Sequence, residues 1–194
     1  MRHALLIVIG LLALPPLAAC GPAVGAGATA GLAAYDERGI DGVSRDTRTA
    51  FEIRGKLLEK QNALPFKIGV EVYEGRALLT GVVQDDQSRA DVVGLAYQVP
   101  SVRRVLNEIQ VRPAGSVIDF THDAWITTQL QFKITFDKKI LGVNYSIETV
   151  NGVLYLIGIA QDQAELDRVI AYARSIERVR EIISHVRLKR DAAA

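Results

Sequence analysis

The chain has 194 residues, and its 23 Lys and Arg residues against 22 Asp and Glu residues give a formal net charge of +1. A nearly neutral body gives no general electrostatic basis for nucleic-acid binding, so attraction to an anionic surface must come from a local patch. Three widely separated histidines, a single cysteine and the lack of metal-, nucleotide- or nucleophile-binding motifs indicate a protein that is not an enzyme and needs no cofactor.

Residues 1–19 have the pattern of a secretion signal, with Arg2 ahead of an apolar run that Pro15 and Pro16 interrupt. The run is too short to cross a bilayer, so a spanning helix is not expected. The sequence LAACG, from Leu17 to Gly21, resembles the lipobox of bacterial lipoproteins, in which the cysteine is lipidated and becomes the mature N-terminus. An ordinary secretory peptide followed by an unmodified cysteine is the alternative.

Cys20 is the predicted lipidation site, and the sequence holds no second cysteine that could pair with it. Acyl chains such as palmitate would hold the protein on a membrane, because each buried CH₂ group contributes about 0.8 kcal/mol. Residues 20–46, which continue GPAVGAGATAGLAA after the cysteine, are predicted to form a flexible tether. Lipoproteins that remain in the inner membrane usually have aspartate at the position of Gly21, so the resemblance implies the outer membrane, facing the periplasm.

The rest of the chain is a repeat, because VEVYEGRALLTGVVQDD recurs 77 residues later as SIETVNGVLYLIGIAQDQ. Glycines and apolar residues stay in register at this offset through the remainder of the repeat. We therefore predict two tandem α+β domains, residues 47–112 and 118–189. Each has about 65 residues, so its core is marginal alone and the two domains are expected to pack together.

The residue pattern of each copy predicts the element order αββαβ, in which two helices pack on a three-stranded sheet. The first two strands of each copy alternate apolar with polar residues on either side of a short turn. The turns are Glu74-Gly75 and Asn151-Gly152, and the second pair is the one that a type I′ hairpin prefers.

Acidic residues mark the start of the second helix in each copy: Asp85-Asp86 in the first and Asp162 in the second. Apolar residues follow them at helical spacing. The last strands, residues 102–111 and 179–188, alternate apolar with charged residues, which predicts a sheet with one solvated face.

The order of these elements resembles the BON domain. Two short motifs, present in both copies, also resemble this domain. One is a glycine near the end of the second strand, in LLTGVV and YLIGIA. The other is a V-x-x-V step into the last strand, in PSVRRVLNEI and ERVREIISHV. Two such domains behind a lipobox resemble the dual-BON outer-membrane lipoproteins of Gram-negative bacteria, the DolP or YraP type, over residues 17–188. The segments DAWITTQL and ETVNGVLYLIG carry this resemblance most closely.

The resemblance implies a protein without catalytic activity that binds anionic phospholipid through the first helix of its second domain. It also implies support of outer-membrane integrity, partly at the division site. The residues that the resemblance assigns to lipid belong to this helix and the segment after it: Trp125, Thr128, Gln129, Phe132, Lys133, Phe136, Lys138 and Lys139. A structural or adaptor lipoprotein that uses the same residues to bind an envelope protein is the alternative.

The first helix of the second copy has two apolar stripes, about 140° apart on a helical wheel. The first stripe, Ile126, Leu130 and Ile134, is predicted to face the core, because Ile53 and Leu57 match it 73 residues earlier. The second stripe lies on the other side of the helix and is aromatic: Trp125, Phe132 and Phe136.

The aromatic stripe has no counterpart in the first copy, where Glu52 and Glu59 take the positions of Trp125 and Phe132 at an offset of 73. A stripe that the shared fold does not need must be covered by something specific to the second domain. Three interpretations are open: it inserts into a bilayer interface, it packs against the first domain, or the helix bends and both stripes join one core.

Lysines beside the aromatic stripe favour the bilayer. Lys133, Lys138 and Lys139 could meet lipid phosphates, and each cation near an anionic surface contributes about 1 kcal/mol. The change of offset from 73 in the helix to 77 in the strands predicts that the connection at residues 138–142 is four residues longer than in the first copy.

Overall fold

The computed structural model describes residues 34–60, 68–113 and 119–189. The first domain contains α2 (Gly39–Lys60), β1 (Ile68–Tyr73), β2 (Arg76–Val83), α3 (Asp86–Tyr97) and β3 (Arg104–Val111). The second contains α4 (Phe120–Phe136), the short 3₁₀ helix η1 (Gly142–Asn144), β4 (Tyr145–Val150), β5 (Val153–Ala160), α5 (Gln163–Arg174) and β6 (Glu181–Leu188). These elements confirm two α+β domains of the order αββαβ.

The two sheets have the same topology. Their strand orders are β1-β2-β3 and β4-β5-β6, so the second strand of each domain is central. It pairs antiparallel with the first strand through the hairpin and parallel with the last strand, which the chain reaches through a helix. The parallel pair requires such a crossover, and α3 and α5 supply it.

The predicted hairpin turns are confirmed by their backbone angles. Glu74 and Gly75 have φ values of 53° and 72°, and Asn151 and Gly152 have 52° and 74°. Two successive positive φ values define the type I′ turn, whose twist matches that of the strands it joins.

The predicted helix starts are also confirmed. The side chain of Asp85 accepts a hydrogen bond from the N–H of Ser88 at 2.7 Å, and that of Asp162 accepts one from Glu165 at 2.8 Å. Each aspartate satisfies an N–H group that the first turn of the helix leaves unpaired.

Buried aspartates correct the predicted register of the first helices. Asp46 accepts hydrogen bonds from both N–H groups of the first hairpin turn, and Asp123 accepts them from both of the second, at 2.7–3.0 Å. These aspartates are 77 positions apart, as are the starts of β1 and β4, so one offset covers helix and strand alike. The predicted four-residue extension at residues 138–142 is therefore wrong.

Helix α2 begins at Gly39, inside the segment 20–46 that the sequence predicted as tether. Asp36 and Asp46 are buried, and the Arg38 guanidinium lies between them, 2.7 Å from the first carboxylate and 3.0 Å from the second. This buried ion triad holds the start of the domain in place. The signal peptide, Cys20 and the rest of the predicted tether, residues 1–33, lie outside the described residues.

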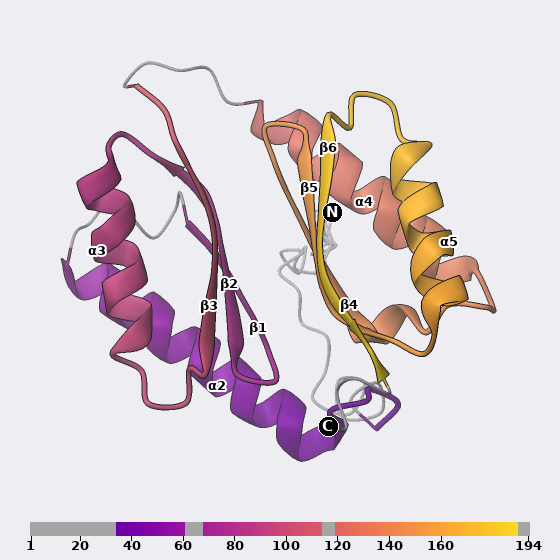
Figure 1. Ribbon diagram of the computed structural model, residues 1–194, viewed down its shortest axis with the longest axis horizontal. Coiled ribbons are helices and arrows are strands. Elements are labelled where there is room, and N and C mark those ends of the chain that lie inside the picture. Colours follow the sequence, from indigo (N-terminus) through magenta and orange to yellow (C-terminus); the bar gives the residue numbers. More distant parts are fainter. Residues whose placement is uncertain (1–33, 61–67, 114–118, 190–194) are drawn as a thin grey trace, which may run out of the picture.

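The domains pack through their sheets and form four layers, in the order helices, sheet, sheet and helices (Figure 1). Helices α2 and α3 cover one face of the first sheet, and α4 and α5 cover the outer face of the second. A third apolar cluster lies between the sheets, from both domains: Tyr73, Leu78, Leu106, Tyr155, Ile157 and Ile159. The sheet face that we expected to be solvated is therefore partly covered by the other domain.

Polar contacts also join the domains. The N–H of Glu37, just before α2, donates to the side chain of the fully buried Asn144 at 3.0 Å, and the Glu37 carboxylate lies 3.0 Å from Lys189. The side chain of Gln110 contacts the second hairpin, where it accepts a hydrogen bond from the side chain of Asn151 at 2.9 Å. Hydrogen bonds and an ion pair from both ends of the first domain thus attach it to the second domain.

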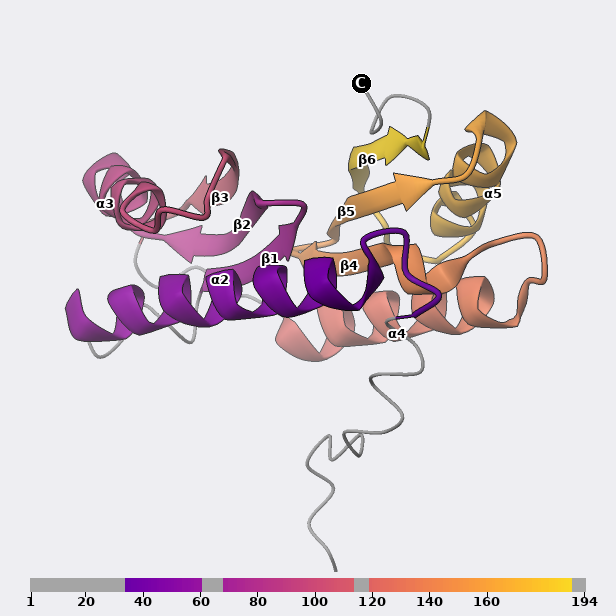
Figure 2. The ribbon, with the colours of Figure 1, turned by 90° about the horizontal axis from the view of Figure 1, so that it is seen from below.

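Figure 2 shows that the two sheets approach each other at β1 and β4 and diverge toward β3 and β6. Helices α2 and α4 both lie on the side where the sheets are close, below them in this view. The molecule therefore presents two different sides: a helical side with α2 and α4, and an opposite side where the sheets open.

Candidate lipid-contacting surface on helix α4

The core face of α4 is the one that the sequence predicted. Ile126, Leu130 and Ile134 are completely buried, and they pack against the second sheet and α5. The buried Asp123, bound to the hairpin turn, lies on the same side. Together these residues fix the rotation of the helix about its own axis.

With this rotation fixed, the aromatic stripe faces solvent. Trp125 is 43% exposed, Phe132 63% and Phe136 70%, and the two phenylalanine rings contact each other with centroids 4.5 Å apart. No core cluster of the described residues includes any of the three rings. Neither packing against the first domain nor a merged core accounts for them.

The corrected register also changes the comparison with the first domain. At an offset of 77, the positions of Trp125, Phe132 and Phe136 are held by Arg48, Gly55 and Glu59, not by the two glutamates that the offset of 73 gave. The conclusion from the comparison stays the same, because the first domain folds without any aromatic residue at these positions.

His122 is a neighbour of the stripe that the sequence analysis missed. Its ring stacks on that of Trp125 with centroids 5.6 Å apart and planes inclined by 21°. Its Nε2 atom is buried and has no hydrogen-bond partner among the described residues. The spacing i, i+3 on one helix was the available signal, since residues at this spacing are neighbours on a helix surface.

The predicted cations lie at one end of the aromatic stripe. Lys138 and Lys139 are exposed directly after α4, and Lys133 is half-buried with its Nζ 5.6 Å from the centroid of the Tyr172 ring. A hollow of about 560 Å³ opens beside them and is lined by Lys138, Lys139 and Arg168, among others. Asp162 and Glu165 line the same hollow, so its three cations face two carboxylates.

A third carboxylate, that of Asp137, lies beside the hollow. Asp137 accepts hydrogen bonds from the N–H of Lys139 and from the hydroxyl of Tyr172, which lower the pKa of its carboxyl. It also lies 3.8 Å from Arg168. Asp137 is therefore ionised at neutral pH and opposes part of the charge of the neighbouring lysines.

The two remaining predicted residues lie on α4 but differ in exposure. Thr128 is exposed, and its hydroxyl donates to the carbonyl of Ala124 at 2.8 Å, so the hydroxyl is already used within the helix. Gln129 is half-buried. The strongest candidates on this surface are therefore the aromatic stripe and the lysines at its end.

Comparison with known families matches the BON domain twice, over residues 45–113 and 122–190. The chain belongs to the BON domain family. The described residues of these two ranges contain both sheets, α3 and α5, α2 from residue 45 onward, and all of α4 except Phe120 and Thr121. The candidate surface is thus part of the second BON domain.

Three relatives are similar to this BON protein over more than one domain. An uncharacterized protein in the gshII 5′ region of Anaplasma centrale is 40% identical over 130 residues, 66% of this chain and 86% of that one. The outer membrane lipoprotein DolP of Haemophilus influenzae is 29% identical over 150 residues, 76% and 78% of the two chains. The osmotically-inducible protein Y of Escherichia coli is 25% identical over 146 residues, 74% and 73% of the two chains.

Across the described ranges of the chain, none of the helices combines the length and the apolar character that a membrane crossing needs. Residues 34–60, 68–113 and 119–189 also bring no three His, Cys, Asp or Glu side chains together as metal ligands. The exposed aromatic stripe of α4 remains the feature of the second BON domain that its fold does not explain.

Proposed function

We propose that this protein is an envelope lipoprotein of the outer membrane, anchored through Cys20 and facing the periplasm, whose second BON domain binds anionic phospholipid. The observation that carries this proposal is the exposure of Trp125, Phe132 and Phe136 on a helix whose other face is locked into the core. Its role is non-catalytic support of envelope integrity.

The chemistry of the surface suits the interface of a bilayer. Tryptophan and phenylalanine rings enter the boundary between headgroups and acyl chains, while lysines at the edge contact phosphate groups. Lys138 and Lys139 directly follow the helix that carries the stripe, and Arg168 of α5 lines the hollow beside them. The similarity to the outer membrane lipoprotein DolP supports the same location.

A lipid anchor makes weak binding by this surface sufficient. A chain already held at the membrane by Cys20 meets lipid at a high effective concentration, so that a few rings and cations can hold α4 on the bilayer. The surface then orients the domains, and the anchor supplies most of the affinity.

Replacement of Trp125 by glutamate tests the proposal. A form without residues 1–20 keeps every described residue, and its binding to vesicles of phosphatidylglycerol in phosphatidylcholine is measured by co-sedimentation. We expect Trp125→Glu to weaken binding about tenfold or more, because it removes an interfacial ring and adds a charge that anionic lipid repels.

Tyr97→Glu is the control, because Tyr97 is a 56% exposed aromatic residue at the end of α3, which lies away from the side of α2 and α4 (Figure 2). We expect it to leave vesicle binding nearly unchanged. Both variants should melt within a few degrees of the wild type, since both positions are exposed. Unchanged vesicle binding by folded Trp125→Glu would refute lipid binding and leave an envelope protein as the partner of the stripe.

A further inference from the structure

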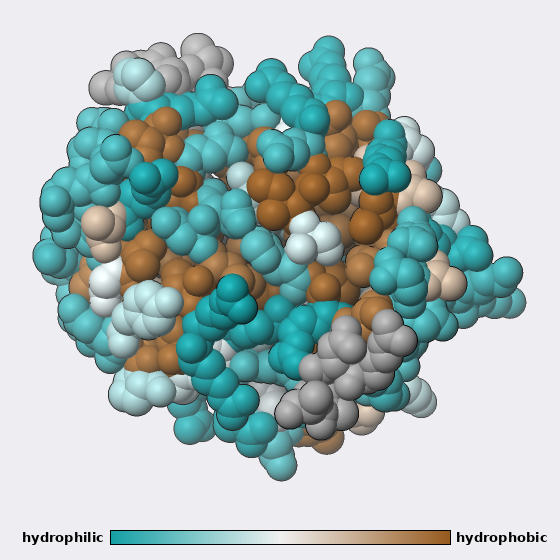
Figure 3. Space-filling model, in the orientation of Figure 1, coloured by the Kyte–Doolittle hydropathy of each residue, from teal (hydrophilic) through white to brown (hydrophobic). Residues whose placement is uncertain are grey.

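Large exposed apolar side chains are concentrated on the helical side of the molecule. Among the described residues there are ten of them, and seven belong to α2 or α4. Figure 3 shows the molecule from the opposite side, where strongly hydrophilic residues gather between the two domains, in the lower centre. Single exposed apolar residues are common on protein surfaces, but their concentration on one side indicates a contact surface.

Helix α2 contributes three of these residues, Ile40, Phe51 and Leu58, with 54%, 66% and 52% of each side chain exposed. They lie within about 20° of each other on a helical wheel and form the α2 stripe. The buried residues of the helix lie about 140° away from the stripe: Gly42, Asp46, Thr49, Ala50, Ile53 and Leu57. The α2 stripe therefore points away from the first sheet.

The BON fold does not require the α2 stripe. At the offset of 77, the second domain has Thr128 in place of Phe51 and Thr135 in place of Leu58. Both threonines are exposed on α4, which packs on its sheet in the same way. Apolar residues at these positions of α2 therefore need an explanation other than the stability of the domain.

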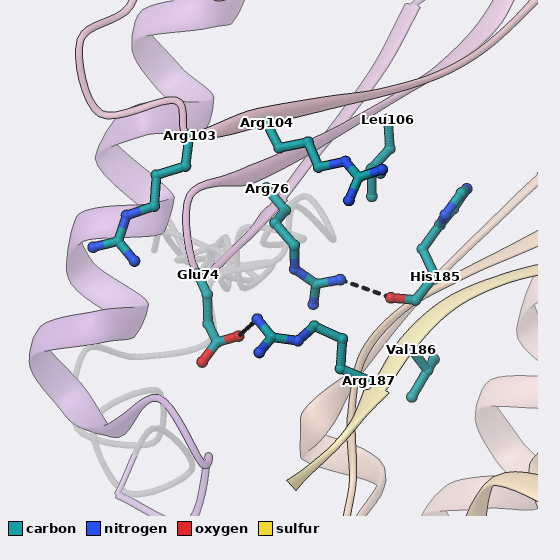
Figure 4. A pocket seen from close by; sticks show the side chains of 8 residues that line it. All are labelled: Glu74, Arg76, Arg103, Arg104, Leu106, His185, Val186 and Arg187. Carbon is teal, nitrogen blue, oxygen red and sulfur yellow. Dashed lines mark hydrogen bonds and ion pairs between the residues drawn. The ribbon is translucent and has the colours of Figure 1, made fainter. Parts of the chain in front are cut away.

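Contacts between the sheets hold α2 and α4 in one arrangement. Arg76 of β2 donates from Nη1 to the carbonyl of His185 in β6 at 2.8 Å, and Arg187 of β6 lies 3.4 Å from Glu74 in the first hairpin turn (Figure 4). The apolar cluster between the sheets holds the same arrangement. A bilayer that meets α4 therefore meets the side of the molecule on which α2 also lies (Figure 2).

The charges around Phe51 are compatible with an anionic surface. Its nearest neighbours on the helix surface are three or four positions away in the chain: Thr47, Arg48, Arg54 and Gly55. Arg48 is exposed, whereas Arg54 lies 3.5 Å from Glu71. The exposed carboxylates of α2 lie about 100° around the helix from the stripe: Asp41, Glu52 and Glu59. Lipid phosphates therefore meet no carboxylate of α2 directly beside Phe51.

The spacing of the α2 stripe favours a bilayer over a protein partner. A helix that binds in a protein groove needs apolar anchors every three or four residues, whereas Ile40, Phe51 and Leu58 are separated by 11 and 7 positions. They are spread over about 27 Å of helix. Lipid can surround separate side chains at the boundary between headgroups and acyl chains, so this surface does not need a partner of matching shape.

We propose that the first BON domain also contacts the membrane, and that the α2 stripe enters the same anionic bilayer as the aromatic stripe of α4. The inference rests on the proposed function, because α4 identifies the bilayer as the occupant. Both domains then rest on the membrane through their first helices, and the side where the sheets open faces the aqueous phase.

The single tryptophan of the chain allows each helix to be observed separately. In the form without residues 1–20, Trp125 is the probe of α4, and the double variant Trp125→Phe, Phe51→Trp moves the only tryptophan to α2. Fluorescence is measured with vesicles of phosphatidylglycerol in phosphatidylcholine, with and without brominated acyl chains that quench tryptophan on contact. We expect vesicles to shift the emission of both proteins to shorter wavelength, and brominated vesicles to quench both.

Tyr97→Trp in the same Trp125→Phe background is the matched control, because Tyr97 is an exposed aromatic residue of α3, away from the helical side. Its emission should not change. A response of Trp125 without one from Phe51→Trp would overturn this inference and leave the proposed function intact, whereas no response at either position would overturn both. Emission of Phe51→Trp that is already at short wavelength in a dimer without lipid would assign the stripe to a second copy, and would also overturn the inference.

Phe51→Gln gives a second measurement that adds no charge. We expect its binding to the vesicles to be about fivefold weaker than that of the wild type, because the apolar surface of the ring is no longer buried in lipid. Tyr97→Gln should bind as the wild type does. Both positions are exposed, so both variants should melt within a few degrees of the wild type. Equal vesicle binding by wild type and folded Phe51→Gln would contradict a contact of α2 with the bilayer.

Discussion

Replacing Gly158 by alanine is expected to lower the free energy of unfolding by about 3 kcal/mol or more. Gly158 has a φ of +156°, which side chains rarely adopt, and a Cβ atom there would stand 2.0 Å from the backbone oxygen of Asn144. Strand β4 cannot move away, because Tyr145 is paired with Gly158 across the hairpin. The clash is therefore with backbone held on both sides, which explains the glycine in YLIGIA.

Gly94→Ala is the matched control, because a Cβ at Gly94 meets no atom within 4 Å. Gly94 lies inside helix α3, where alanine should stabilise the helix by about 0.5–1 kcal/mol. Urea unfolding followed by circular dichroism measures both changes. A Gly158→Ala variant as stable as the wild type would show that β4 and β5 separate more easily than their pairing indicates.

Local signals in the sequence were sufficient to predict each domain. The hairpin turns at Glu74-Gly75 and Asn151-Gly152, and the aspartates that begin α3 and α5, depend on a few adjacent residues and are present in both copies. The repeat at an offset of 77 then showed which strands and helices correspond. Features fixed by neighbours in the chain can be recognised from the chain alone.

The register of the first helices could not be obtained from apolar spacing. Apolar residues on one face of a helix recur every three or four positions, so a shift of four places Ile53 on Ile126 as readily as on Leu130. The buried aspartates Asp46 and Asp123 resolve this ambiguity, since each must reach a hairpin turn. A polar residue with one possible partner specifies register better than a repeated apolar pattern.

The packing of the two domains depends on contacts between distant parts of the chain. The sequence did carry one signal for the covered sheet faces: RALLTGVV and VLYLIGIA are almost continuously apolar, as strands buried on both faces are. It carried none for the meeting of Arg76 with Arg187, which are 111 positions apart. Only the relative placement of the two sheets brings them together.

Stability should fall as pH rises from about 5 to 8, because Glu148 is protonated more readily in the folded protein than in the unfolded chain. Burial first, and then repulsion by Glu71, raise the pKa of Glu148 from its ordinary value of 4.5 to about 7, while Arg54 lowers it. Glu148 lies on β4 and Glu71 on β1, where the two sheets approach each other. The folded state therefore binds more protons than the unfolded state between these pKa values, so the free energy of unfolding decreases through this window.

The Glu148→Gln variant should remove the part of this dependence that Glu148 causes, because glutamine resembles the protonated acid and has no charge to desolvate or to repel Glu71. Burial also raises the pKa of Glu71, which keeps a dependence of the same sign in the variant. At pH 8 we expect it to be more stable than the wild type by about 2 kcal/mol, after a discount for the solvent that reaches the partly exposed side chain. At pH 5 the two proteins should differ little. Glu52→Gln, which removes an exposed carboxyl from α2, should keep the wild-type slope. If the free energy of unfolding falls with pH at the same slope in the wild type and in Glu148→Gln, another group binds the proton. If the two free energies differ at pH 8 and become equal at low pH, the pH-sensitive contact lies between β1 and β4.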